Sequence, residues 1–188
     1  RAIQRQEFLF HYQPQVDADG RMIGVEALAR WQHPVRGLVP PLAFIGLAEE
    51  TGLVFELDRL CRKKALLNAK DLKQGEKLFI NTLPTTIHDP EFRGKYLKEF
   101  LDDIKIKPAN LVFEITERSA IENYPLFKEA VDYYTDIGVA IAIDDTGTGY
   151  STLESIIELK PGYLKFDISM VKNIDKSFVK KEMLRTLK

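Results

Sequence analysis

The sequence has little of what marks a secreted, disulfide-linked or membrane-spanning protein. Its one cysteine, Cys61, excludes an intrachain disulfide, and no apolar run approaches the ~20 residues of a membrane span. No signal peptide is recognisable at the amino end. We therefore expect a cytoplasmic protein, or the cytoplasmic part of a membrane-attached parent, in which Cys61 is a small buried apolar residue.

The sequence also has no excess of positive or negative charge. The 27 basic and 28 acidic residues leave a net charge of −1, so electrostatics give no case for a nucleic-acid polymer or an anionic membrane as partner. The three histidines, His11, His33 and His88, have no second histidine at ligand spacing, and we expect none of them to bind a metal.

What is present is an ordinary globular composition, 45% hydrophobic and 29% charged, in a chain of 188 residues. That length is enough for one good hydrophobic core. The chain begins at Arg1 without an initiator methionine and stops at Lys188 inside a helical pattern that has no capping Gly or Pro. We interpret it as a fragment of a longer protein.

Residues 139–151 organise the rest of the chain, because an apolar run there leads to adjacent acids, Asp144 and Asp145. In a strand, Asp144 shares its face with small residues, and the other face is bulky and β-branched. The small residues are Ala140 and Ala142, and the bulky ones are Val139, Ile141 and Ile143. This parity predicts a strand with its narrow face inside a barrel and its broad face against helices. The two acids alone leave two interpretations open, a metal or acid–base site and a solvated turn with a helix cap.

The order of elements indicates an α/β fold. Residues 8–16 and 22–30 read as strands joined by a turn at 17–20, which predicts an antiparallel hairpin. After a loop at 31–40, strands and helices alternate, which favours parallel strands. The further predicted strands are 77–82, 111–117, 139–145 and 163–167, and the predicted helices are 41–50, 54–73, 90–104, 123–137, 150–159 and 173 onward.

Polar residues stand at the carboxyl ends of successive predicted strands: Glu26, Asn81, Glu114, Asp144 with Asp145, and Lys165. In a parallel barrel these ends converge on one face, where active sites are built. Carboxylate and amide oxygens suit Mg²⁺, Mn²⁺ or Ca²⁺ rather than structural zinc. The adjacent aspartates could serve two metals about 3.5–4 Å apart, the spacing of two-metal phosphoryl chemistry.

Two basic residues belong to the same pattern. Lys165 could orient a nucleophilic water or neutralise phosphate charge, and Arg30, on the strand face of Glu26 and Leu28, could bind a phosphate through two N–H groups. Both have a structural alternative, an internal ion pair with the same acids. For Glu26 and Arg30 a weak surface pair is a further alternative.

The polar strand ends lie within motifs that resemble EAL domains, the cyclic di-GMP phosphodiesterases. The resemblance covers essentially the whole chain, with its motifs in the family's order. These motifs are Tyr12-Gln13-Pro14, Glu26-Ala27-Leu28-Ala29-Arg30, residues 36–52, Ile80-Asn81, Glu114-Ile115-Thr116-Glu117, residues 144–151 and Leu164-Lys165-Phe166-Asp167.

The resemblance implies a modified TIM (β/α)8-type barrel with an antiparallel first strand. It also implies hydrolysis of one phosphodiester bond of cyclic di-GMP to linear pGpG, with Mg²⁺ or Mn²⁺ as cofactor. The implied metal ligands are Glu26, Asn81, Glu114 and Asp144, with Asp145 at a second metal. Lys165 would contact the attacking water, and Glu26, Lys165 and Asp145 are the implied catalytic residues.

The implied substrate-binding residues are Gln13, Leu28 and Arg30. In the family, the loop after Asp145 commonly links metal binding to dimerisation, and Glu117 helps to hold it. The loop residues here are Thr146, Gly147, Thr148 and Gly149. The implied partners are cyclic di-GMP, a second copy of the chain, and other signalling domains of the parent protein, such as GGDEF or sensor domains.

The sequence departs from the family in two places. Thr146 stands where the family usually has Phe, and the last two strands, which carry a catalytic Glu and a substrate-contacting Gln, are absent from this chain. We therefore expect residues 1–188 to be a single EAL-type domain without its C-terminal part, which is unstable alone or is completed by another chain or by further residues of the parent protein. The alternatives are an inactive module that binds cyclic di-GMP or regulates through dimerisation, and another metal-dependent barrel enzyme acting on a phosphate or enolate.

Overall fold

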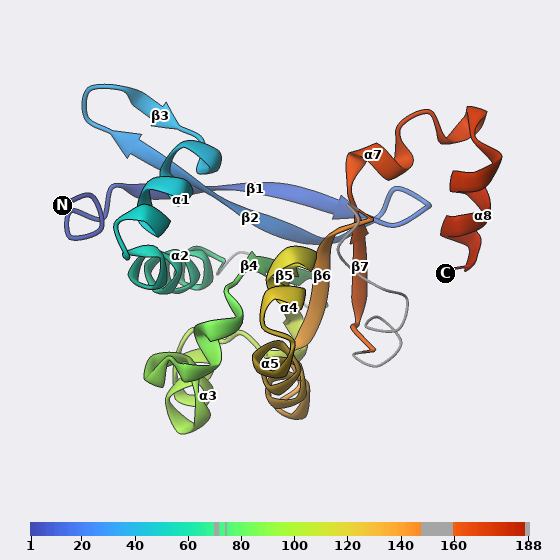
Figure 1. The fold of residues 1–188 in the computed structure, drawn as a ribbon. Coiled ribbons are helices and arrows are strands. Elements are labelled where there is room, and N and C mark those ends of the chain that lie inside the picture. The colour runs from blue at the N-terminus through green and yellow to red at the C-terminus, as the bar shows by residue number, and fades with distance from the viewer. Residues whose placement is uncertain (70–71, 74, 148–159, 187–188) are drawn as a thin grey trace.

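The computed structural model describes residues 1–69, 72–73, 75–147 and 160–186. Its centre is a seven-stranded sheet with the order β1-β2-β4-β5-β6-β7, and β3 pairs with β2 beside this path (Figure 1). Strands β2, β4, β5, β6 and β7 run parallel to one another, and β1 is antiparallel to β2. The predicted α/β fold with an antiparallel first strand is therefore confirmed. Within the described residues β1 and β7 are edge strands, so the sheet is open rather than a closed barrel.

The first two strands form the predicted hairpin. Strand β1 spans Phe8–Val16 and β2 spans Met22–His33. In the turn, Asp17 Oδ1 accepts hydrogen bonds from the N–H groups of Asp19 and Arg21, both at 2.9 Å. The predicted loop at 31–40 is wrong, because β2 continues to His33 and pairs with β3, Gly37–Val39. The side chain of His33 closes the turn between them, since its Nδ1 accepts from the N–H groups of Val35 and Arg36.

Four short strands continue the parallel part of the sheet beyond β2, and β7 is half-buried while the other three are mostly buried. The four are β4 (Lys77–Asn81), β5 (Leu111–Thr116), β6 (Ala140–Thr146) and β7 (Tyr163–Phe166). Strand β4 begins opposite Gly24 of β2, where an added Cβ atom would collide with the carbonyl of Lys77. This glycine therefore lets β4 dock beside β2, two residues before Glu26.

The helices follow the predicted order with shifted ends. The longer ones are α1 (Pro41–Glu50), α2 (Val54–Asn68), α3 (Gly94–Asp103) and α5 (Tyr124–Asp136). The predicted helix at 54–73 therefore ends early, at Asn68. The predicted helix at 90–104 is confirmed over most of its length as α3, but its first residues form a 3₁₀ turn, Pro90–Phe92, which follows another 3₁₀ turn at Pro84–His88. Each turn begins with a proline, and the side chain of Asp89 caps the second by accepting from the N–H of Glu91 at 3.1 Å.

Short helices account for the remaining differences. Helix α4, Glu117–Glu122, begins where we expected the end of a strand, and the hydroxyl of Thr116 caps it by accepting from the N–H of Ser119. The predicted terminal helix starts later, as α8 (Phe178–Thr186), after α7 (Ile168–Val171) and the 3₁₀ turn Ile174–Lys176. The predicted helix at 150–159 lies outside the described residues.

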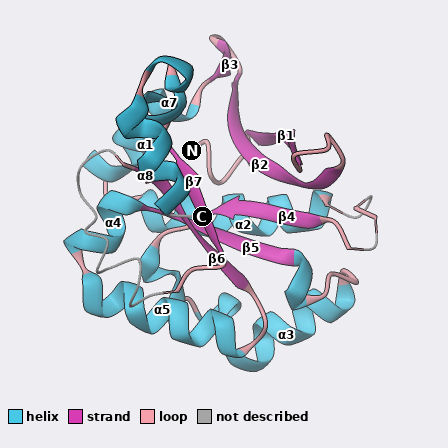
Figure 2. Ribbon diagram, turned by 90° about the vertical axis from the view of Figure 1, so that its right-hand side faces the viewer, coloured by secondary structure: helices cyan, strands magenta, loops and turns pink. Residues whose placement is uncertain are grey.

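The two faces of the sheet have different cores. The large core lies between one face and helices α2, α3 and α5, and it contains Val139, Ile141 and Ile143 (Figures 1 and 2). The opposite face carries a small cluster of Phe79, Val112 and Ala142, with Ala140 and Tyr163 packed against it. The face assignment predicted from parity is therefore confirmed.

Two further observations bear on the expectations from composition. Cys61 is half-buried in α2, and burial raises the pKa of its thiol to about 12, as expected of an inert cysteine. Across the described residues, no helix combines the length and apolarity needed to cross a bilayer.

Candidate functional site

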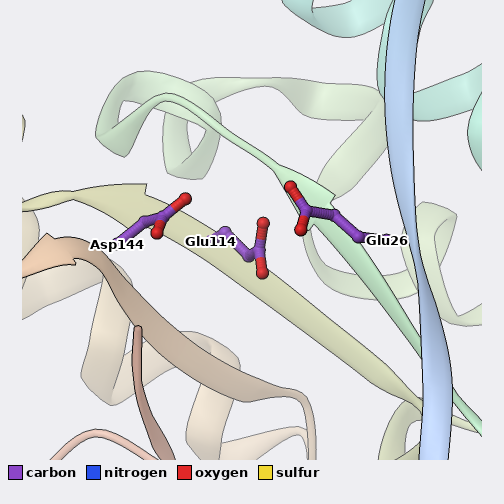
Figure 3. Close-up of side chains that lie close together, drawn as sticks. All are labelled: Glu26, Glu114 and Asp144. Atoms are coloured by element: carbon purple, nitrogen blue, oxygen red, sulfur yellow. The ribbon is translucent and has the colours of Figure 1, made fainter. Parts of the chain in front are cut away.

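Three carboxylates converge on the sheet face opposite the large core. Glu26 comes from β2, Glu114 from β5 and Asp144 from β6, and each offers an oxygen within 4.8 Å of the others (Figure 3). Strand pairing places them together, because Asn81 of β4 pairs with Glu114 and Thr116 of β5 pairs with Asp144. The predicted convergence of strand ends is confirmed for these three residues.

Lys165 lies at the centre of the three acids, which we call the acid cluster. From β7, its Nζ lies 3.0 Å from Glu26 Oε2, 2.8 Å from Glu114 Oε1 and 3.1 Å from Asp144 Oδ2. The internal ion pair that the sequence left open for Lys165 is therefore formed. One ammonium faces three carboxylates, which leaves the cluster with an excess of negative charge when all four groups are ionised.

Burial makes this charge costly. The side chain of Glu114 is fully buried, and burial, aided by Glu26 and Asp144 and opposed by Lys165, raises its pKa to about 8. Its Oε2 has no hydrogen-bond partner among the described residues. Burial disfavours the Lys165 ammonium, but the acids, Glu114 foremost, outweigh burial and raise the pKa of Lys165.

The donor set fits a divalent cation with a preference for oxygen ligands. The cluster offers carboxylate oxygens from three strands, and the unpartnered Oε2 of Glu114 is a vacant acceptor in the part of the chain that the structure describes. Mg²⁺, Mn²⁺ and Ca²⁺ take such ligands, whereas structural zinc prefers thiolate and imidazole. The residues present therefore match the predicted type of metal.

Two amide side chains border the cluster at Glu26. Asn81 Nδ2 lies 3.4 Å from Glu26 Oε1, and Gln15 Nε2 donates to Glu26 Oε2 at 3.1 Å. Sequence reasoning named Asn81 and missed Gln15. Strand parity could have identified Gln15 in the sequence, because Gln15 lies on the same face of β1 as Gln13, and Gln13 pairs directly with Glu26 in the hairpin.

The predicted substrate-binding residues lie in the β1–β2 hairpin. Gln13 is on β1, opposite Glu26, and Leu28 and Arg30 are on β2. Gln13 is exposed, and Leu28 and Arg30 are half-buried. Arg30 Nη1 donates to the carbonyl of Ala29 at 2.8 Å, so the internal ion pair considered for this residue is not formed among the described residues. The substrate-binding role of all three stays a prediction.

Asp145 is not part of the acid cluster. Its side chain is exposed, its φ is +56°, and its N–H donates to Asp144 Oδ1 at 2.9 Å. Burial and the adjacent Asp144 carboxylate raise the pKa of Asp145. The described acids within 4.8 Å of one another do not include it, so its place at a second metal stays a prediction.

The loop after Asp145 is held from two sides. Glu117 Oε2 accepts from the N–H of Gly147 at 3.2 Å, and a Cβ atom at Gly147 would lie 2.6 Å from Cγ of Met170 in α7. Gly147 has φ +100°, which also favours glycine. Thr146 is buried, and its hydroxyl donates to the carbonyl of Ile143 at 3.3 Å. Thr148 and Gly149 lie outside the described residues, and the coupling role of this loop stays a prediction.

A cavity of about 250 Å³ adjoins the acid cluster. Glu114 and Asn81 line it on the strand side, and α1 and α2 supply the opposite wall, including Phe44 and Asp58. Sequence reasoning assigned no residue of that wall to the site, since nothing in the spacing of α2 connects it to the strand ends. A larger apolar cavity of about 510 Å³ lies between residues 1–4, α1 and α2, and none of its described lining residues belongs to the predicted site.

Comparison with known protein families identifies the family of this chain. The family model of the EAL domain matches residues 1–187. This chain belongs to the EAL domain family. The family resemblance of its motifs is therefore confirmed.

Similar proteins extend the comparison. This EAL domain is 36% identical over 169 residues to an uncharacterized signaling protein of Caulobacter vibrioides, covering 89% of this chain and 21% of that protein. It is 30% identical over 190 residues to the cyclic di-GMP phosphodiesterase PdeR of Escherichia coli, covering 100% of this chain and 29% of PdeR. The chain thus spans less than a third of either relative.

A solved structure has the same architecture. The PaMucR phosphodiesterase in complex with c-di-GMP is 29% identical and superimposes with a TM-score of 0.82, covering 97% of this chain and 75% of that one. The prediction that this chain has the fold of EAL domains, a modified TIM barrel, is therefore confirmed.

Proposed function

We propose that this EAL domain belongs to a metal-dependent phosphodiesterase that hydrolyses cyclic di-GMP to linear pGpG. In this reaction the oxygen of one water molecule bonds to phosphorus, one P–O bond of the ring breaks, and the leaving 3′ oxygen takes up a proton. The observation that carries the proposal is the convergence of Glu26, Glu114 and Asp144 around a buried, unpartnered carboxylate oxygen. Similarity to PdeR and PaMucR, both named phosphodiesterases, supports it.

The acid cluster and Asn81 would hold Mg²⁺ or Mn²⁺, and Asp145 would serve a second ion. A bound divalent ion supplies polarisation of the phosphate and a lower pKa for its water. Lys165 reaches the acids from β7, and its Nζ would orient the attacking water and offset charge that develops on the phosphate. Gln13, Leu28 and Arg30 would bind the nucleotide, Arg30 through the N–H groups it has beyond the one given to Ala29.

The proposal also covers the parent protein, its oligomeric state and its neighbouring domains. We take residues 1–188 as one EAL-type domain of a cytoplasmic, multidomain signalling protein, because the chain covers 21% and 29% of two relatives. A homodimer would form through the loop after Asp145, with Glu117 and Thr146 as its inner supports. GGDEF or sensor domains are the expected neighbours.

The test is direct hydrolysis. The complete domain of the parent protein is purified and incubated with cyclic di-GMP and Mg²⁺, and nucleotides are separated by chromatography. We expect pGpG from the wild type and none from Glu26→Ala, whose fold should be retained because the substitution relieves crowding of acids. A matched control is Glu99→Ala, which removes an exposed glutamate paired with Lys95 at 3.3 Å and should leave turnover unchanged. A folded wild type that yields no pGpG would disprove the proposal.

Replacement of Mg²⁺ by Ca²⁺ separates binding from chemistry. Ca²⁺ is larger and polarises its ligands less, so the nucleotide should still bind while pGpG forms much more slowly. Calorimetry measures the binding and chromatography measures the product. Equal turnover with both ions would contradict the assignment of a metal-polarised reaction.

A binding module is the second candidate function. It is favoured by Thr146, which is buried at a position usually Phe in the family. Calorimetry would then show tight binding of cyclic di-GMP without pGpG. If the protein binds no cyclic di-GMP, a substrate screen with Mg²⁺ tests the remaining alternative, another phosphate or enolate substrate.

A further inference from the structure

A buried charge network joins helix α2 to the segment after β4. Arg62 is fully buried, with its Nε 2.8 Å from Asp58 Oδ2 and its Nη2 3.1 Å from Asp89 Oδ2. Arg59 Nε donates to the same oxygen of Asp89 at 2.8 Å. The guanidinium of Arg62 also lies over the ring of Phe92, 3.9 Å from its centroid. We call Asp58, Arg59, Arg62 and Asp89 the α2 network.

The network holds the segment at two points. Near its start, Asp58 Oδ1 accepts from the N–H of Leu83 at 3.3 Å, and Asp58 Oδ2 accepts from the hydroxyl of Thr86 at 3.1 Å. Near its end, Asp89 Oδ1 accepts from the N–H of Glu91. Asp58 thus holds the segment next to β4, and Arg59 and Arg62 hold it at Asp89, eight residues beyond the end of that strand.

The first point lies beside the candidate active site. Leu83 follows Asn81 by two residues, and Asn81 reaches toward Glu26 at 3.4 Å. On the other side of this strand end, the N–H of Thr82 donates to the carbonyl of Glu114 at 2.8 Å. The end of β4 is therefore attached to β5 through Thr82 and to α2 through Leu83.

We propose that Asp58, held by Arg62, is a positioning residue for the active site, acting through Leu83 to set the position of Asn81. This inference rests on the proposed function, in which Asn81 is a metal ligand. Asp58 also lines the cavity that Asn81 and Glu114 line. A shift of the end of β4 at Asn81 would therefore change the shape of the site. A buried ion pair seldom adds stability over apolar packing, whereas a carboxylate that accepts from a backbone N–H and a hydroxyl fixes geometry.

The two carboxylates of the network give a matched experiment. Asp58→Leu and Asp89→Leu each remove one buried partner of Arg62, but only Asp58 contacts the end of β4. Residue-resolved hydrogen exchange is measured at the Thr82 amide and, as an internal reference in the sheet, at the Ile115 amide. We expect Asp58→Leu to raise the ratio of Thr82 to Ile115 exchange about tenfold and Asp89→Leu to leave it unchanged.

Metal affinity is the second readout, because a residue that only stabilises the fold would not change it. Calorimetry with Mn²⁺ should give an affinity about tenfold weaker for Asp58→Leu and an unchanged one for Asp89→Leu, at a temperature where both are folded. Asp58→Asn keeps an acceptor oxygen and should restore most of the affinity. Leu83→Pro keeps the backbone φ of −78° but deletes the N–H, and it should reproduce the exchange result if Asp58→Leu does not fold.

The outcomes separate the two proposals. Equal Thr82 to Ile115 ratios in Asp58→Leu and Asp89→Leu would overturn the positioning role. The same holds if Leu83→Pro leaves the ratio at its wild-type value. A wild type that binds no Mn²⁺ would count against the proposed function, while the exchange comparison would still decide the role of Asp58.

Discussion

The acid cluster with Lys165 and the α2 network are each groups of four charged residues that are buried or half-buried, but their charges are balanced differently. The acid cluster sets three carboxylates against the ammonium of Lys165. The α2 network sets two carboxylates against two guanidinium groups, and every carboxylate oxygen in it accepts a hydrogen bond. In the acid cluster, Glu114 Oε2 accepts none among the described residues.

The pKa shifts reflect this difference at Asp89 and Glu114 but not at Asp58, where burial raises the pKa of the carboxyl in spite of Arg62, Thr86 and Leu83. Burial alone would raise the pKa of Asp89, but the hydrogen bond from Arg59, helped by Glu91 and Arg62, lowers it. In the acid cluster, burial and the neighbouring acids raise the pKa of Glu114 to about 8 in spite of Lys165. A balanced network needs no further cation, whereas an acid excess is stabilised by one. The comparison therefore separates a group that positions the backbone from a group that binds a ligand.

The largest expected effect comes from unbalancing the α2 network. Arg62→Met leaves Asp58 and Asp89 buried without their shared partner, which should lower the free energy of unfolding by about 3–5 kcal/mol. Urea denaturation measures the change. As a control, Arg185→Met removes an exposed arginine paired with Glu182 and should cost less than ~1 kcal/mol. Equal costs for the two variants would break the comparison.

A smaller effect is expected from Lys165→Met in the metal-free protein. The substitution removes the ammonium that three acids share, so the free energy of unfolding should fall by about 2 kcal/mol. Mn²⁺ should then stabilise the variant more than the wild type, since no ammonium competes for the acids. Thermal unfolding with and without Mn²⁺ measures both effects. Lys63→Met, at a half-exposed lysine paired with Glu91 at 2.9 Å, is the control and should change neither quantity appreciably.

The smallest effect concerns pH. Because the folded-state pKa of Glu114 is about 8 and its ordinary value is 4.5, the folded state binds more protons than the unfolded state between these values. Its contribution to the stability of the metal-free protein therefore falls as pH rises through this window and levels off above about 8. Urea denaturation at pH 5, 7 and 9 should show a fall in the free energy of unfolding that Glu114→Gln removes. An identical pH dependence in wild type and variant would show that Glu114 is not the group responsible.

Strand parity predicted the acid cluster because it depends on local geometry. Asp144 shares a face with Ala140 and Ala142, and this face proved to be opposite the large core. Arg30 shows the limit of the same reasoning. Parity puts its Cβ on the side of Glu26, but a long side chain rotates freely, and its guanidinium donates to Ala29.

The α2 network could not be predicted because its spacing is ambiguous. Asp58 and Arg62 are four residues apart on a helix, which in sequence is the pattern of an exposed pair. Asp89, the third member, lies 27 residues beyond Arg62 in the chain. Asp89 also accounts for the late start of the helix predicted at 90–104, because it caps the short turn Pro90–Phe92 and binds Arg62, and α3 begins only at Gly94.

Sequence alone determined the order of the strands, the face on which each acid lies and the family, because strand periodicity and short motifs are local. Tertiary structure decided which charges are buried and how they are paired. Lys165 meets Glu26 across 139 residues of chain, and no local pattern encodes such a contact. Desolvation and long-range pairing, which depend on packing, turn one group of charges into a candidate metal site and the other into its support.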